Sequence, residues 1–131
     1  MVAGLSRLLR RVGGMTTETK RPGAPTFVAL EVSLEVIRSL RGVVGVIRKR
    51  SSKLAEQIEE AASSVAANLA EGNRRQGKDR LHFFRVAAGS ADETGTHLRV
   101  AEAWGWVSAE QIEAPMSLLD RELAMLWKPT H

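Results

Sequence analysis

The chain has 131 residues, a formal net charge of +4 at pH 7, and neither cysteine nor tyrosine. This length suits one domain. The lack of cysteine excludes disulfides, zinc–thiolate sites and a cysteine nucleophile. Aromatic residues make up 5% of the chain, which is few for a β-rich domain, and no apolar run reaches the ~18 residues of a membrane span. With no secretory signal in the sequence, we expect a cytoplasmic protein that does not enter the membrane.

The excess positive charge lies at the N-terminus. Residues 1–25 contain five basic side chains and one acidic side chain, whereas residues 26–131 contain equal numbers of both. Glycine and proline punctuate the first segment, so we expect a flexible basic extension over 1–25 and a folded domain over 26–131. An arginine-rich start is also typical of organelle targeting peptides, and Met15 is an alternative initiator. Because the folded part is neutral, a partner attracted by charge needs local basic patches.

Four segments after residue 25 repeat apolar residues at the spacings of three and four that are typical of amphipathic helices. They cover roughly 26–50, 51–72, 78–103 and 108–127. No segment alternates like a strand, and the connections are short. The sequence therefore predicts an all-α protein, an antiparallel up-down-up-down four-helix bundle.

Local signals mark the ends of these helices. Gly72 is a natural stop for the second helix, and Ser108 with Gln111 forms a capping box before the fourth. Pro115 lies too deep for a first turn, which predicts a kink or a later start of that helix. In the second helix, Asn68 is the polar member of a heptad seam, a position that fixes helix register.

Two groups of basic residues flank the second helix and are candidates for contacting phosphates. They are Arg48, Lys49, Arg50 and Lys53 at one end, and Arg74, Arg75, Lys78 and Arg80 at the other. A helix of about 20 residues holds them roughly 30 Å apart. One subunit therefore offers no continuous basic stripe, and solvated loop charge is the alternative interpretation.

The region of about 54–107 resembles a known family in its sequence pattern. Asn-x-x-Glu-Gly is followed by a basic turn, by Phe84 near the position of a family aromatic, and by Gly-Ser-x-x-Glu. This pattern is similar to that of the 23S rRNA-intervening-sequence, or S23, family of four-helix-bundle proteins. The matching positions are Asn68, Glu71, Gly72, Gly89, Ser90 and Glu93.

The resemblance implies an antiparallel four-helix bundle, commonly a homopentameric ring, with no enzymatic activity generally ascribed to it. A more distant similarity points to the accessory protein of diversity-generating retroelements, a pentamer that binds nucleic acid and a reverse transcriptase. One departure concerns Glu59 and Glu60, because family members often carry basic residues there. This departure argues against a basic outer face on the second helix.

The matched polar residues have two readings. In the favoured interpretation, they form a structural or subunit-interface network of Asn68, Ser90 and the two glutamates Glu71 and Glu93. Gly72 and Gly89 are then packing positions. Glu71 and Glu93 as an acid–base pair is the alternative, but no nucleophile or phosphate loop accompanies them. Glu93 and His97 are one turn apart, yet the second Glu-x-x-His of a metal-binding bundle is missing, so we expect neither metal nor cofactor.

Trp104 and Trp106 flank Gly105 at the end of the third helix. They cap the core or anchor a subunit interface, where tryptophan is enriched. Our functional expectation is a non-enzymatic, self-assembling scaffold that binds structured RNA or DNA through the basic groups repeated around a ring. The alternatives are a protein-interaction module that docks a partner enzyme such as a reverse transcriptase, and a small enzyme using Glu71 and Glu93.

Overall fold

A computed structural model describes residues 24–130 of the chain, with side chains over 28–127. Four α-helices make up this part: α2 (Ala24–Arg48), α3 (Ser52–Asn73), α4 (Gly77–Ala103) and α5 (Ala109–Thr130). The predicted all-α, four-helix architecture is confirmed. Helix α2 begins slightly before the predicted start, and the rest of the predicted N-terminal extension lies outside the described residues.

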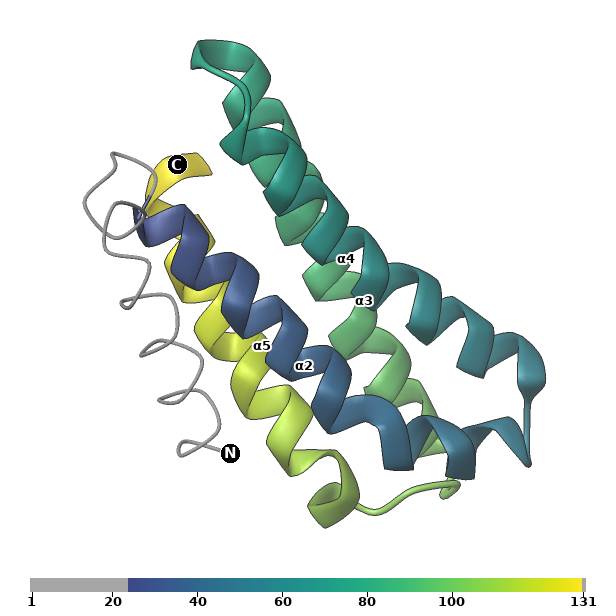
Figure 1. The fold of residues 1–131 in the computed structure, drawn as a ribbon. Helices are drawn as coiled ribbons and strands as arrows, with labels where there is room; N and C mark the ends of the chain where they lie inside the picture. The colour runs from purple at the N-terminus through teal and green to yellow at the C-terminus, as the bar shows by residue number, and fades with distance from the viewer. Residues whose placement is uncertain (1–23, 131) are drawn as a thin grey trace.

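The four helices form a square in which neighbours in sequence are neighbours in space. Helix α3 packs between α2 and α4, and α5 closes the bundle by packing against both α4 and α2. Figure 1 shows the chain reversing direction at each short loop, so that the start of α2 and the end of α5 lie at the same end of the bundle. At that end, α3 and α4 extend beyond the other two helices as a protruding hairpin (Figure 1).

The core follows directly from the apolar spacing of the sequence. Each helix buries one stripe of aliphatic side chains and leaves charged residues on the opposite side, the pattern of a helix half-covered by its neighbours. Among the most deeply buried side chains are Val32, Ile47, Ile58, Leu69, Leu98 and Leu126. Gly95 of α4 faces α5, because a Cβ atom added there would lie 3.8 Å from Met116 and 3.9 Å from Leu119, an ordinary contact distance.

Side-chain caps fix where the helices begin. The Ser51 hydroxyl accepts a hydrogen bond from the Leu54 amide at 3.1 Å. The predicted capping box is confirmed: the Gln111 amide donates to Ser108 Oγ at 3.2 Å, and the Ser108 amide donates to Gln111 Oε1 at 2.8 Å. The predicted later start of α5 is wrong. The capping box starts the helix ahead of Pro115, which is buried, and its packing offsets the hydrogen bond that proline cannot make.

None of the helices between residues 24 and 130 is long and apolar enough to cross a bilayer.

Candidate nucleic-acid interface

The first basic group, here called the loop cluster, consists of Arg48, Lys49, Arg50 and Lys53 around the α2–α3 connection. Arg48 Nη2 forms an ion pair of 2.6 Å with Glu59 Oε2 on α3. The other three side chains are exposed and form no hydrogen bond or ion pair with any described residue. The loop cluster therefore presents three cations to solvent whose charge nothing described in the subunit neutralises.

The second group, the tip cluster, consists of Arg74, Arg75, Lys78 and Arg80 at the end of the protruding α3–α4 hairpin. Arg75 Nε donates to Glu71 Oε2 at 2.8 Å, and its guanidinium lies 5.2 Å from the centre of the Phe83 ring. Arg80 lies over Phe84 at 5.3 Å. Two of the four cations are thus held against the hairpin itself. The side chains of Arg74 and Lys78 remain exposed and form no hydrogen bond or ion pair with the described part of the chain.

Glu71 belongs to the tip rather than to a buried site. The hydrogen bond from Arg75 lowers the pKa of the Glu71 carboxyl, which lies at the surface. The Glu71 carboxyl consequently stays ionised at neutral pH. Because Glu71 and Asp79 flank Arg75, the tip carries less net positive potential than its four basic residues suggest.

Close packing positions the tip. Gly72 is buried, and a Cβ atom added there would lie 2.7 Å from Phe84 Cε1. Phe84 is itself buried, and its ring packs directly on the backbone of α3. Gly77 then starts α4 with a φ of +60°, a left-handed conformation that glycine adopts without strain. These two glycines explain how the hairpin turns within so few residues.

A polar network joins α3 to α4 below the tip. Asn68 Nδ2 donates to the Ser64 carbonyl at 2.8 Å and to Ser64 Oγ at 3.0 Å, and Ser64 Oγ lies 2.9 Å from Ser90 Oγ. Asn68 and Ser90 are therefore connected through a serine that the sequence pattern did not single out. Such a network fixes the register of two helices.

The remaining matched residues have other surroundings. Glu93 Oε2 contacts His97 Nε2 at 3.2 Å on its own helix, and Glu71 pairs with Arg75, so the structure does not join the two glutamates to each other. Gly89 is exposed, and a Cβ there would meet nothing within 4 Å in the described chain. Within the described subunit, Gly89 therefore does not have the packing role that was expected of it.

The two basic clusters lie at opposite ends of α3 (Figure 1). One subunit therefore brings the members of each cluster together but does not join the clusters. Between them, α3 exposes Glu56 and Glu60 to solvent, which is consistent with the acidic departure from the family pattern.

Glu122 is a buried carboxyl that no sequence motif singled out. This α5 side chain is fully buried, and neither carboxyl oxygen has a hydrogen-bond partner in the described structure. Burial raises the pKa of Glu122 to about 8. The signal was present, because Glu122 lies between Leu119 and Leu126 at helical spacing on the core side of the helix.

Trp104 and Trp106 stack on each other with ring centres 5.9 Å apart and planes at 14°. Trp106 packs against the core, whereas Trp104 is 69% exposed. Trp106 therefore fits the predicted capping of the core, whereas the interface role of Trp104 stays a prediction.

Comparison with known proteins agrees with the fold. A model of the family described as 23S rRNA-intervening sequence protein matches residues 29–128. A protein of unknown function from the S23 ribosomal protein family of Bacteroides thetaiotaomicron VPI-5482, with a solved crystal structure, has a TM-score of 0.68 and 20% sequence identity; the match covers 78% of this chain and 97% of that one. A search of curated proteins found no match.

Proposed function

Because the chain belongs to the 23S rRNA-intervening sequence protein family, we propose that it is a non-enzymatic, self-assembling helical scaffold of the cytoplasm that binds structured RNA or DNA. The contacts in this proposal are made by the loop cluster and the tip cluster to phosphates. Five copies in a ring would repeat each cluster around one rim and so convert small patches into a belt.

One observation carries the proposal. Lys49, Arg50 and Lys53 lie together at one end of the bundle, exposed and without a described partner. A cation already paired within the subunit gains little from a phosphate, whereas an unpaired one gains the full entropy of counterion release. This difference ranks the loop cluster above the tip cluster, where Arg75 is engaged by Glu71 and Phe83.

Neutralising the loop cluster is expected to weaken nucleic-acid binding. The triple variant Lys49→Gln/Arg50→Gln/Lys53→Gln should lose about tenfold or more in affinity at 0.1 M salt, with the log–log salt slope reduced by about 0.9 for each phosphate contact removed. Fluorescence anisotropy with labelled structured RNA and duplex DNA over a salt series measures both quantities. The double variant Arg74→Gln/Lys78→Gln should have a smaller effect.

The matched control neutralises Arg7, Arg10 and Arg11, which lie outside the described residues. If this control abolishes binding while the loop-cluster variant binds like the wild type, the N-terminal segment is the binding element and the proposal is wrong. Wild-type protein that shows no salt-dependent binding to either nucleic acid also refutes it.

A second candidate function is docking of a partner enzyme, and the exposure of Trp104 supports it. A stacked, solvent-facing tryptophan is an unusual surface residue and a frequent anchor of interfaces. A reverse transcriptase is one such partner, on the distant similarity to the retroelement accessory protein. This function predicts a stoichiometric partner that co-purifies after nuclease treatment with the wild type but not with Trp104→Ala. Equal recovery with both proteins contradicts docking through this tryptophan.

A further inference from the structure

An open groove runs along the outside of the bundle between α4 and α5. It consists of two adjoining hollows, of about 410 and 170 Å³, that share Arg99, Met116 and Asp120. Met116 and Leu123 are only half-buried there, and Gly95 adds no side chain of its own. The apolar part of the lining, here called the floor, consists of Ala91, Gly95, Ile112, Met116, Leu119 and Leu123.

The walls of this groove are acidic. Four exposed carboxylates line it: Asp92 and Glu102 on α4, and Glu113 and Asp120 on α5. None of the four forms an ion pair with any residue that the structure describes. Arg99 is the one cation among the lining residues. An occupant that complements the groove therefore has an apolar side and several positive charges.

The N-terminal segment of the same chain has this chemistry. Residues 1–23 lie outside the described structure, and within them residues 5–12 contain three arginines and no acidic residue. On a helix, the four apolar side chains of residues 5–12 share one face, and the arginines fall on the two flanks of the opposite side. The apolar residues are Leu5, Leu8, Leu9 and Val12, and the arginines are Arg7, Arg10 and Arg11.

The length of the segment also suits this groove. A helix over residues 5–12 is about 12 Å long, and the stretch of α4 from Asp92 to Glu102 is about 15 Å long. The start of α2 lies at the same end of the bundle as the end of α5 (Figure 1), about 21 Å along α5 from Met116. Residues 13–23 span up to about 36 Å when extended. Residues 5–12 can therefore reach the groove of their own subunit.

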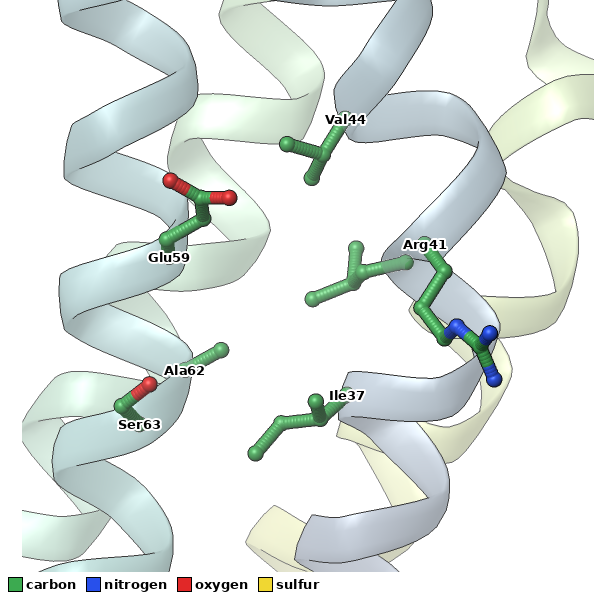
Figure 2. Close-up of a pocket in the computed structure, with 7 residues that line it drawn as sticks. Ile37, Arg41, Val44, Glu59, Ala62 and Ser63 are labelled. Carbon is green, nitrogen blue, oxygen red and sulfur yellow. The ribbon is translucent and has the colours of Figure 1, made fainter.

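A second groove, of about 350 Å³ between α2 and α3, suits the segment less well. Figure 2 shows Ile37 and Val44 beside the space, whereas Arg41 is turned away from it. The carboxylate in its lining, Glu59, already forms an ion pair of 2.6 Å with Arg48. Charge complementarity therefore favours the α4–α5 groove as the place where the arginine-rich segment binds.

We propose that residues 5–12 dock as an amphipathic helix in the α4–α5 groove of their own subunit. The apolar face covers the floor, and the long arginine side chains reach Asp92 and Asp120 on the two walls. A docked segment withholds its arginines from phosphates, so nucleic acid competes with the groove for them and the contact is autoinhibitory. This contact requires neither the self-assembly nor the nucleic-acid binding of the proposed function.

Hydrogen exchange of the full chain tests the docking. Amides of residues 5–12 should exchange about tenfold or more slowly than in a synthetic peptide of the N-terminal segment alone. Asp92→Lys/Asp120→Lys reverses the charge of both walls and should return the exchange toward the rate in the peptide. Glu56→Lys/Glu60→Lys makes the same change of charge on the exposed side of α3 and is the matched control, which should keep the wild-type protection.

Cysteine cross-linking identifies the groove, because the chain has no cysteine of its own. Ser6→Cys/Ser117→Cys places one thiol on the segment and one in the α4–α5 groove, whereas Ser6→Cys/Ser63→Cys places the second thiol in the α2–α3 groove. Both Ser63 and Ser117 are exposed. On mild oxidation, the first pair should form an intrachain disulfide about fivefold or more faster than the second, because docking raises the effective concentration of the thiols.

Three results would overturn the docking: wild-type exchange at the rate of the free peptide, equal protection in the two lysine variants, or equal cross-linking of the two cysteine pairs. A disulfide that forms chiefly between chains on a non-reducing gel would place the segment on a second copy and would also overturn it. Thermal melts check that the lysine variants are folded, and the cross-linking does not depend on them. Anisotropy on the wild type is independent, because docking without nucleic-acid binding supports this contact and refutes the proposed function.

Discussion

Replacing Glu122 by glutamine is expected to remove most of the pH dependence of stability between pH 5 and pH 8. In the native protein, burial holds the pKa of this carboxyl at about 8 against an ordinary value of 4.5. As the pH rises through this window, the unfolded chain releases the proton while the native chain keeps it. The unfolded state is therefore favoured progressively. The contribution of a neutral Glu122 is fully present below about pH 4.5 and is lost as the pH approaches 8.

The expected effect is large for a small domain. The difference between the two pKa values corresponds to about 5 kcal/mol of unfolding free energy over the whole window, as an upper estimate. Few other buried groups could contribute to the pH dependence of stability. The other buried carboxyl of the described residues, Glu35, accepts a hydrogen bond of 2.8 Å from Arg38 Nη1. The Glu122 carboxyl has no hydrogen-bond partner among the same residues.

Urea denaturation at pH 5, 6, 7 and 8 measures this effect. Glu113→Gln is the control, because Glu113 is an exposed carboxyl of the same helix, and it should reproduce the wild-type slope. The comparison uses the change with pH rather than absolute stability, since a buried glutamine leaves its own amide unsatisfied. Parallel pH profiles for the wild type and Glu122→Gln would show that Glu122 is ionised or solvated in the native protein.

The second large effect is expected at Gly72. In Gly72→Ala, the added Cβ would lie 2.7 and 2.8 Å from two atoms of the Phe84 ring and 3.1 Å from Phe83 Cβ. Phe84 is 2% exposed, so its ring has little room to move, and the hairpin must shift instead. Overpacking of this kind costs about 1–3 kcal/mol.

The same substitution at Gly42 is expected to change the unfolding free energy in the opposite direction. Gly42 is an exposed helical residue whose Cβ would meet nothing within 4 Å, and alanine there should stabilise the protein by about 0.5–1 kcal/mol. Thermal or urea unfolding of the two variants side by side gives both values. A Gly72→Ala protein as stable as Gly42→Ala would mean that Phe84 does not pack on α3 as described.

Helix number and helix limits followed from the sequence because they depend on local chemistry. Apolar spacing, the Ser108–Gln111 capping box and the stop at the end of α3 act over a few residues, and each was predicted close to its observed place. The later start at Pro115 was wrong because tertiary burial overrode a local penalty. Glu122 was not singled out, although its spacing from Leu119 and Leu126 places it on the core side of the helix, because glutamate is rarely buried.

The candidate interface was predictable only as a set of residues. Composition identified both basic clusters, but which of their cations are engaged depends on contacts across helices. Glu59 of α3 pairs with Arg48 of α2, and Phe83 of α4 lies beneath Arg75. Neither contact has a sequence signal. The link from Asn68 to Ser90 through Ser64 was equally beyond the pattern, because it requires the register of α3 against α4.

The closed square of helices also bears on how the chain folds. Three of its four packed seams join helices that are adjacent in sequence and separated by short loops, and only the α2–α5 seam joins the two ends of the domain. Contacts between near neighbours in sequence form with little loss of chain entropy, and proteins dominated by them fold on the microsecond to millisecond scale. Docking of α5 onto α2 carries the largest loop-closure entropy of the four. Helix α5, which carries the buried Glu122 carboxyl, is thus also the helix whose docking onto α2 joins the two ends of the domain.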